Sequence, residues 1–359
     1  MYIKNYLLFL WEIILNNLGF HRVYKLNFVV TKDCNSRCQN CNIWQVKPAN
    51  ELSLKNIQKI ANSYRDIRWL DITGGEPTLR KDMSEIVRCF YQANPNLLFV
   101  HFPTNGILPQ KIEEQARRIN RIGNFKLIIT VSVDGPEKIN DRLRGVPGNF
   151  SRSVETYKRL SGISGVAVYF GMTLFKSNYQ TLEETFNSLK REIPKLRKKF
   201  FHLNIGQTSE HYYENLNSKD IDINMEIYQA IQKFRNSLTG NGRLLKIIPT
   251  PFDIIDEIYR TLSLKFIQTK KTPISCNALK SSVYLSEKGM VYPCSMWNHP
   301  LGNIKNYRYS LQEVLKSKKL KRGIKMIENK KCSHCWTPCE AYQSIIGNVG
   351  EVLKELSSR

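Results

Sequence analysis

The sequence predicts an α/β fold, an open and partial (β/α)6 barrel followed by a small cysteine-rich domain. Strand-like and helix-like segments alternate along the first two-thirds of the chain, at a spacing of roughly thirty residues. The strand-like segments are rich in Val, Ile, Phe and Tyr and show little polar alternation, which is typical of parallel strands covered on both faces. Five of the nine cysteines gather in the last third of the chain.

The expected elements follow one another in a regular order. Strands are expected over 24–31, 67–73, 97–103, 125–133, 165–175 and 200–206, with helices over 51–64, 81–93, 109–121, 150–160 and 179–192. In the first helix, Leu54, Ile57, Ile60 and Tyr64 recur at three- and four-residue steps and form one apolar face. Six successive strand–helix units imply parallel strands with right-handed crossovers. We therefore expect a barrel over 23–215, a helical connector over 216–270, the cysteine-rich domain over 271–345 and a tail over 346–359.

The first 22 residues are strongly apolar. The run "MYIKNYLLFLWEIILNNLGF" is interrupted by Lys4 and Glu12 and falls short of the roughly 20 uninterrupted apolar residues of a clean membrane span. It also lacks the basic start and small-residue cleavage site of a signal peptide. Two interpretations remain, a helix lying on a membrane surface and a helix that closes the bottom of the barrel.

The charge balance favours an anionic partner. Lys and Arg number 54 against 31 Asp and Glu, a formal charge of +23. Nucleic acid, a phosphorylated substrate or acidic lipid would fit such a surface. The basic run 315–331 also has Leu315, Leu320 and Ile324 on one face, so its lysines can equally be the solvated side of a helix.

Three cysteines lie close together in "TKDCNSRCQNCNIW", at Cys34, Cys38 and Cys41. Disulfide scaffolds are small and uniformly cysteine-rich, which this chain is not. Structural zinc sites usually have four ligands in paired knuckles, and no fourth Cys or His lies near this motif. An iron–sulfur cluster fits better, because its usual ligands are thiolates and the missing fourth ligand leaves one iron free for a substrate or cofactor.

This spacing, on a loop after a strand, resembles the signature of the radical S-adenosylmethionine (SAM) superfamily. The resemblance implies a TIM-like partial barrel and a 4Fe–4S cluster whose free iron binds SAM. Reductive cleavage of SAM would yield a 5′-deoxyadenosyl radical that abstracts a hydrogen atom from the substrate. The chain departs from the family at Asn40, where an aromatic residue is usual, and Trp44 is a candidate to pack the loop instead.

Motifs at four further strand ends extend the resemblance. "TGGEPTL" at 73–79 resembles the family's motif for the amino group of SAM, which implies roles for Gly74, Gly75 and Glu76. "PTNG" at 103–106, "SVDG" at 132–135 and "GMT" at 171–173 are alone only turn or core signals. In barrels of this kind, functional residues gather at the carboxyl ends of strands. By resemblance, the further candidates for binding SAM are Asn105, Ser132, Asp134 and Met172.

The second cysteine region resembles the auxiliary-cluster domains called SPASM or twitch. It has a Cys, a hairpin of the form Gly-x4-Cys and a later C-x2-C. The full SPASM form has seven cysteines, so five favour the version with one auxiliary 4Fe–4S cluster. Which four bind it stays open, and a zinc ribbon is the alternative. The candidates are Cys276, Cys294, Cys332, Cys335 and Cys339, whereas Cys89 is expected to be a small buried hydrophobe.

We therefore expect a cytoplasmic radical SAM oxidoreductase or maturase, with a reductant such as ferredoxin or flavodoxin. An auxiliary cluster would conduct an electron in a net oxidation or in C–C or C–S bond formation. The substrate is unknown and can be anionic, a lipid or a peptide. Ser295 disfavours sulfatase maturation, since those enzymes carry an acidic residue there. No general base can be chosen among Asp71, His101, Tyr169 and His202. The alternatives are a zinc-stabilised nucleic-acid-binding protein and a non-catalytic electron carrier.

Overall fold

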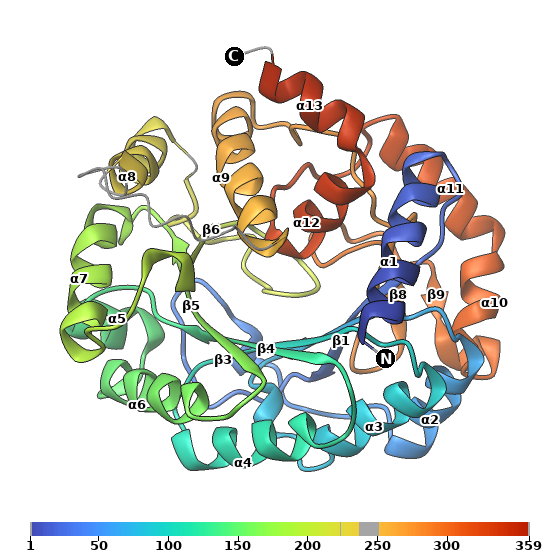
Figure 1. The fold of residues 1–359 in the computed structure, drawn as a ribbon, viewed down its shortest axis with the longest axis horizontal. Coiled ribbons are helices and arrows are strands. Elements are labelled where there is room, and N and C mark those ends of the chain that lie inside the picture. The colour runs from blue at the N-terminus through green and yellow to red at the C-terminus, as the bar shows by residue number, and fades with distance from the viewer. Residues whose placement is uncertain (1, 223, 237–250, 358–359) are drawn as a thin grey trace.

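The computed structural model describes residues 2–222, 224–236 and 251–357 and confirms the α/β fold. Six parallel strands form the curved sheet that was expected (Figure 1). They are β1 (Lys25–Thr31), β2 (Trp69–Gly74), β3 (Phe99–Thr104), β4 (Lys126–Ser132), β5 (Val166–Leu174) and β6 (Phe201–Ile205). Each pairs with its chain neighbour, and the sheet stays open beyond β6.

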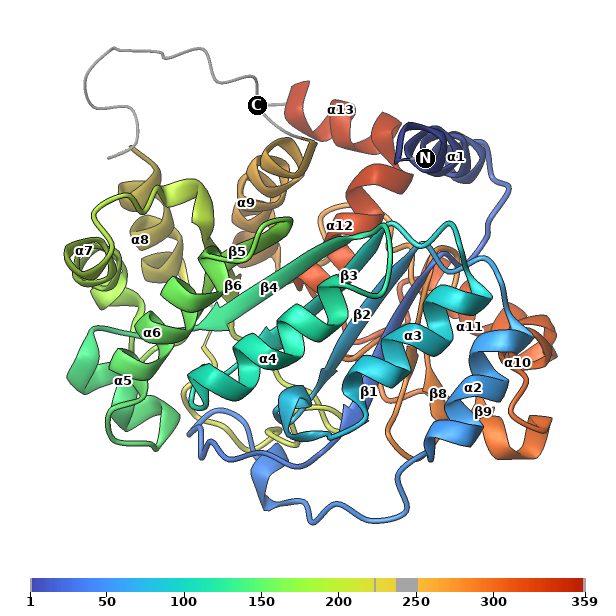
Figure 2. The same cartoon turned by 60° about the horizontal axis from the view of Figure 1, so that its bottom comes forward.

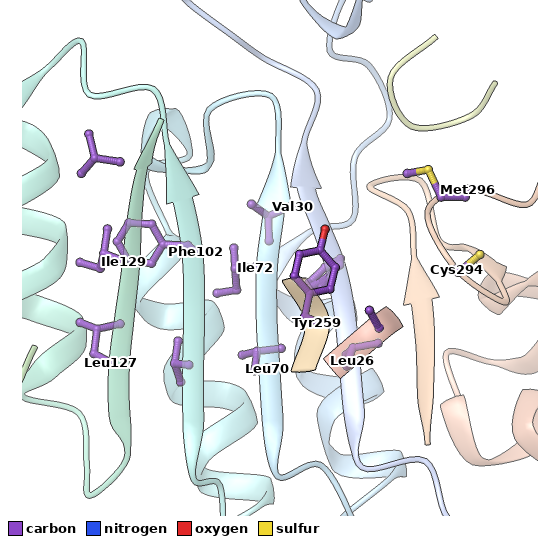
Figure 3. Packing of buried hydrophobic residues seen from close by; sticks show 14 of the residues in the cluster. Leu26, Val30, Leu70, Ile72, Phe102, Leu127, Ile129, Tyr259, Cys294 and Met296 are labelled. Carbon is purple, nitrogen blue, oxygen red and sulfur yellow. The ribbon is translucent and has the colours of Figure 1, made fainter. Parts of the chain in front are cut away.

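Helices cover the outer face of this sheet (Figure 1). Leu26, Leu70, Ile72, Phe102 and Leu127 lie fully buried along β1–β4 (Figure 3). They belong to the apolar cluster that strands and helices share, and burial of this kind is the main favourable term in folding. The helices are α2 (Leu54–Ser63), α3 (Met83–Ala93), α4 (Pro109–Asn120), α5 (Glu137–Arg144), α6 (Asn149–Ser161) and α7 (Leu182–Glu192). Short 3-10 helices lie at η1 (Ile43–Gln45), η2 (Pro77–Leu79), η3 (Tyr179–Thr181), η4 (Lys198–Phe200) and η5 (Ile304–Tyr307).

The cysteine-rich region continues the same sheet, which the sequence did not predict. Strand β7 (Ser282–Leu285) runs parallel to β1, with Lys25 opposite Ser282. Strands β8 (Met290–Tyr292) and β9 (Gly302–Asn303) follow antiparallel, giving the order β6-β5-β4-β3-β2-β1-β7-β8-β9. The second cysteine region is therefore attached directly to the first barrel strand.

Helices complete the second half of the chain. They are α8 (Met225–Asn236), α9 (Pro251–Thr269), α10 (Leu311–Lys316), α11 (Lys318–Glu328), α12 (Pro338–Gly347) and α13 (Val349–Ser357). Helix α12 packs on α9 in the space inside the open barrel (Figure 1). The segment 346–359, expected as a tail, contains the end of α12 and all of α13, where Val352 is buried.

Helix α1 (Tyr2–Asn17) lies across the end of the barrel at which the strands begin (Figure 2). Phe9 packs edge-on against Tyr24 and Phe99, and Glu12 forms a buried ion pair with Arg68 at 2.8 Å. The opposite side of α1 exposes Leu10 and Trp11, which are 52% and 57% accessible. One face of the helix thus covers the barrel, while the other is an unpaired apolar surface. Among the described residues, no helix is long and apolar enough to cross a bilayer.

Candidate active site

A cavity of about 830 Å³ occupies the inside of the barrel. Side chains from the inner faces of β1–β6 line it, together with the loop after β1, helix α9 and the start of α12. Cys34, Cys38 and Cys41 all contribute to its wall. Thus the structure brings the three cysteines of the first motif to one end of an internal cavity.

The cysteine loop, residues 32–45, is held by contacts with distant segments. The backbone N–H of Arg37 donates to Arg144 O, at the end of α5, at 3.0 Å. The indole N–H of Trp44 donates to Cys38 O at 3.3 Å, so Trp44 does support the loop from inside. Asn40 is buried and accepts hydrogen bonds from the Asn215 amide and the Ser218 hydroxyl at 2.9 Å. The departure from the usual aromatic residue therefore fastens the loop to residues 215–218.

The three thiols share an apolar environment. Burial, together with the charge of Cys38, raises the pKa of Cys34 to about 11 and that of Cys41 to about 12. Binding iron must therefore displace protons from these thiols. In the part of the chain that the structure describes, no group of three Cys, His, Asp or Glu side chains is gathered closely enough for one metal ion. Thiolates are nevertheless the usual ligands of iron–sulfur clusters, in which each thiolate holds its own iron.

Gly74 and Gly75 let the end of β2 approach the cysteine loop. Gly74 has φ +151°, and a Cβ there would lie 2.1 Å from Thr31 O. At Gly75, a Cβ would lie 2.2 Å from Asp33 O and 2.9 Å from Cys34 Cβ. The backbone N–H of Gly75 donates to Thr31 O at 2.9 Å. Only glycine fits both positions, and both residues line the cavity.

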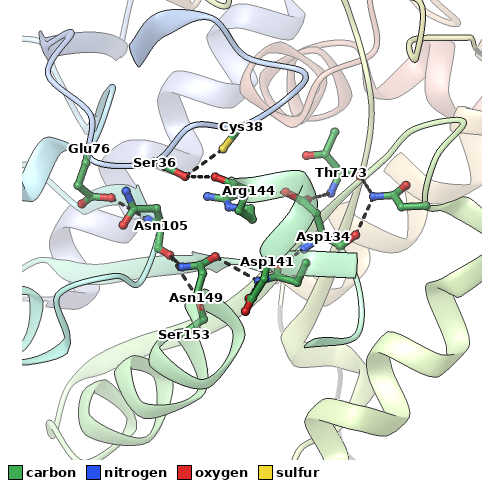
Figure 4. Close-up of polar contacts among 12 residues, drawn as sticks. Ser36, Cys38, Glu76, Asn105, Asp134, Asp141, Arg144, Asn149, Ser153 and Thr173 are labelled. Atoms are coloured by element: carbon green, nitrogen blue, oxygen red, sulfur yellow. Dashed lines mark hydrogen bonds and ion pairs between the residues drawn. The ribbon is translucent and has the colours of Figure 1, made fainter. Parts of the chain in front are cut away.

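Glu76 lies fully buried behind the cavity wall rather than on it. Its carboxylate accepts hydrogen bonds from the Thr104 hydroxyl at 3.0 Å and from the Asn105 backbone N–H at 2.7 Å (Figure 4). Burial raises the pKa of Glu76, although these hydrogen bonds oppose the shift. In this structure Glu76 thus fixes the end of β3, and its contact with SAM stays a prediction.

The ends of β3, β4 and β5 meet beside the cysteine loop. Arg144 and Asp134 form a buried ion pair at 2.8 Å, and the Thr173 N–H donates to Asp134 at 3.1 Å (Figure 4). Burial would lower the pKa of Arg144, but the charges of Cys38 and Asp134 outweigh it and raise that pKa. Asn105 and Ser132 also line the cavity. Each has the cavity-facing position that the sequence led us to expect.

Met172 differs from the expectation. Its side chain is completely buried in the apolar core and does not line the cavity. Its neighbours Gly171 and Thr173 do line it, because successive side chains of a strand point to opposite faces. An approach to SAM at this strand would therefore involve Gly171 or Thr173.

All four candidate bases line the cavity. His101 Nδ1 lies 2.6 Å from Asp71 Oδ1, and Lys25 Nζ lies 3.1 Å from Asp71 Oδ2. Burial would raise the pKa of Asp71, but the charges of Lys25 and His101 outweigh it and lower that pKa to about 2. Tyr169 and His202 stack with ring centroids 4.2 Å apart. Sequence reasoning missed Lys25, although a lysine within the apolar run "VYKLNFVV" was a signal.

Comparison with known proteins decides the family. A model described as the radical SAM superfamily matches residues 28–189, and one described as an iron–sulfur cluster-binding domain, SPASM, matches residues 276–336. The chain belongs to the radical SAM superfamily. It is a radical SAM enzyme that takes a 4Fe–4S cluster and SAM, and its SPASM domain implies auxiliary iron–sulfur binding. The comparison therefore favours the radical SAM enzyme over the nucleic-acid-binding and electron-carrier alternatives.

Individual relatives are distant. Fe-coproporphyrin III synthase from Methanosarcina barkeri is 24% identical over 82% of this chain and 75% of its own length. Sporulation killing factor maturation protein SkfB from Bacillus subtilis is 26% identical over 77% of this chain, but the match spans only 61% of SkfB. The structure of anSMEcpe with bound AdoMet matches 93% of this chain and 98% of its own, with a TM-score of 0.60 and 16% identity. That likeness establishes the shared fold.

Proposed function

We propose that this enzyme removes a hydrogen atom from a substrate held in the barrel cavity and passes an electron to an auxiliary 4Fe–4S cluster. The net reaction is a two-electron oxidation or C–C or C–S bond formation. The observation that carries the proposal is the extent of the cavity. Its wall includes Cys34, Cys38 and Cys41, and also the segment Thr337–Cys339, which begins two residues after Cys335. A substrate in this cavity lies between the two cysteine regions.

The chain's own residues have distinct roles in this proposal. When bound, the first cluster and SAM supply the 5′-deoxyadenosyl radical. The cysteine loop, Gly74 and Gly75 hold SAM against β1 and β2. Asp71 keeps His101 oriented through the 2.6 Å contact, so that His101 accepts the proton that an oxidised substrate releases. Lys25 keeps Asp71 ionised, because it compensates the buried carboxylate.

An acidic electron donor such as ferredoxin or flavodoxin suits the surface charge. The net charge of +23 attracts an anionic protein and accelerates its encounter. Since the attraction is between exposed charges, salt must weaken it. Reduction by flavodoxin should therefore slow markedly between low and physiological ionic strength, whereas reduction by dithionite should be less affected.

Cleavage of SAM tests the proposal that the first cluster cleaves SAM and the auxiliary cluster only accepts an electron. We compare the reconstituted wild type with a Cys34/Cys38/Cys41→Ala variant and a Cys294/Cys335→Ala variant, each reduced with dithionite. The wild type and the second variant should release 5′-deoxyadenosine, while the first should release none. Equal loss in both variants would contradict separate roles for the two cysteine regions.

The substrate subtype is proposed as a peptide or a lipid. SkfB is named as the maturation protein of sporulation killing factor, and one solved structure, SuiB from Streptococcus suis, is bound to precursor peptide SuiA. A lipid is supported by a different observation, the exposed apolar side of α1. Six residues of the first twenty share it, namely Leu7, Leu10, Trp11, Ile14, Leu18 and Phe20, each 48–68% accessible.

Peripheral membrane contact through residues 1–20 belongs to the lipid form of the proposal. Exposed apolar side chains on a chain with a net charge of +23 favour anionic bilayers. The full-length protein should co-sediment with vesicles of phosphatidylglycerol, and Leu10→Gln/Trp11→Gln should reduce the bound fraction several-fold. Binding of the wild type no greater than that of this variant would remove the support for a lipid substrate and leave the peptide.

A further inference from the structure

Cys339 differs from the other four cysteines of its region in what surrounds it. Burial raises the pKa of Cys294 and of Cys335 well above the ordinary value, and the charge of Cys276 adds to both shifts. Cys332 acts in the same way on Cys276 and Cys335. The Ser333 hydroxyl donates to Met296 O at 3.3 Å, so the loop that carries Cys332 and Cys335 lies beside the loop after Cys294. We call Cys276, Cys294, Cys332 and Cys335 the auxiliary group.

Two barrel residues, Asp71 and Lys25, act on Cys339 and do not act on the other four cysteines. Burial, with smaller contributions from Asp71 and Glu340 against that of Lys25, raises the pKa of Cys339 to about 12. The Lys25 ammonium also donates a hydrogen bond to the carbonyl oxygen of Cys339 at 2.9 Å. Since Lys25 stands on β1, this hydrogen bond fixes the backbone of Cys339 against the barrel sheet.

Among the described residues, Cys339 lines the cavity, whereas the other four cysteines of this region do not. Its charge raises the pKa values of Tyr212, Tyr213 and Tyr284, after the larger contribution of burial, so these rings lie within electrostatic reach. All three tyrosines line the same cavity. Cys339 therefore shares the cavity wall with three tyrosines, in the cavity where the substrate is proposed to bind.

Unsatisfied polar groups mark this part of the cavity as a binding site. The side-chain oxygens of Tyr284, Ser295 and Thr337 are buried and have no hydrogen-bond partner among the described residues. These residues are 1%, 4% and 7% accessible, and all three line the cavity. A buried hydroxyl without a partner costs about 1–3 kcal/mol, so three such groups facing one cavity favour a bound partner there. Three hydroxyl donors suit an acceptor-rich group, such as a carbonyl or carboxylate.

We propose that Cys339 is a substrate-facing thiol, not a ligand of the auxiliary cluster, and that the hydroxyls of Tyr284, Ser295 and Thr337 bind a carbonyl or carboxylate of the substrate. The auxiliary group then supplies all four cluster ligands. This inference deepens the proposed function and rests on it, because it assumes that the auxiliary cluster exists.

Iron content distinguishes cysteines that bind the auxiliary cluster from a cysteine that faces the substrate. The wild type, Cys339→Ser and the matched control Cys335→Ser are reconstituted anaerobically and assayed for iron and sulfide. We expect about eight irons per chain in the wild type and in Cys339→Ser, and about four in Cys335→Ser. Loss of about four irons from Cys339→Ser would overturn the assignment. Only four irons in the wild type would instead contradict the auxiliary cluster, so the two failures are distinguishable.

Alkylation tests whether the thiol is free. With seven cysteines on iron, Cys89 and Cys339 remain, so the experiment uses the Cys89→Ser holoenzyme. Prolonged incubation with iodoacetamide at about pH 9 should label Cys339 in the intact holoenzyme, because a small reagent can enter the cavity. Labelling should be slow, since the raised pKa keeps the thiolate fraction low, and its rate should rise with pH. Peptide mass spectrometry should find Cys339 modified and iron retained. An unmodified Cys339, or label only after iron is lost, would overturn the proposal.

A comparison of two tyrosine variants tests whether the Tyr284 hydroxyl is unpaired, and it needs no knowledge of the substrate. Tyr284→Phe removes an oxygen that has no partner, so the melting temperature of the substrate-free holoenzyme should stay unchanged or rise. Tyr342→Phe is the matched control, because the Tyr342 hydroxyl donates to Asp256 at 2.9 Å and its loss should lower the melting temperature. A fall in Tyr284→Phe as large as in the control would show that this hydroxyl is structurally engaged and would contradict the binding site.

Discussion

Replacing Gly75 with alanine should disturb the SAM-binding end of the cavity with little effect on the rest of the fold. The added Cβ would meet Asp33 O at 2.2 Å and Cys34 Cβ at 2.9 Å, and the nearer atom belongs to the backbone. Real Cβ contacts essentially never fall below 3.0 Å, so the cysteine loop must move by nearly an ångström. Overpacking of this kind costs about 1–3 kcal/mol, and the backbone contact places Gly75→Ala near the upper value.

The assay combines urea unfolding of the apoprotein with the iron content of the reconstituted protein. We expect the free energy of unfolding to fall by about 2–3 kcal/mol. Iron should fall from about eight to about four per chain, because displaced thiols lose the first cluster.

Gly350→Ala is the matched control, since nothing lies within 4 Å of a Cβ there and the site is helical. It should keep its iron and gain up to about 1 kcal/mol. A Gly75→Ala protein with eight irons and an unchanged unfolding midpoint would refute the argument from close approach.

Three further predictions concern buried charges and α1. Asp71 has its pKa lowered to about 2, so it stabilises the fold above about pH 4 and that stability is lost as the pH falls from about 4 to 2. Urea unfolding of the wild type at a series of pH values should show the free energy of unfolding fall by up to about 2–3 kcal/mol over this range, and Asp71→Asn should remove that fall. An equal fall in Asp71→Asn would show that protonation of Asp71 is not its cause. Glu12→Ala leaves Arg68 buried and unpaired and should destabilise the protein by about 3–5 kcal/mol, whereas Arg68→Met in the Glu12→Leu background should recover most of the loss. Trp11→Gln should change stability by less than about 0.5 kcal/mol, because that side chain is exposed, and a larger loss would mean that α1 is packed on both sides.

The barrel and its cysteine loop were predictable because their signals are local. Apolar strand runs at regular intervals predicted β1–β6, and the spacing of Cys34, Cys38 and Cys41 predicted a shared site. The Gly74–Gly75 pair predicted a close approach, and the structure identifies the approached group as the cysteine loop itself. Each of these features is determined by residues close together in the sequence.

Features that depend on long-range packing were not predictable. Nothing local indicates that β7 pairs with β1, since any strand edge could have accepted it. A side chain on a strand can face either the cavity or the core, and the motif around Met172 did not indicate which. The structure places Met172 in the core. Cys339 lies four residues after Cys335, but the start of α12 turns it toward Lys25 and the barrel. For α1 both interpretations describe part of the structure, because its two faces have different environments.

The most direct test of the central claim is the iron and sulfide content, with the visible spectrum, of the anaerobically reconstituted wild type beside a Cys34/Cys38/Cys41→Ala variant. Two clusters predict about eight irons in the wild type and about four in the variant, both brown, with SAM perturbing the spectrum of the wild type alone. A colourless wild type that contains zinc in place of iron would contradict the account.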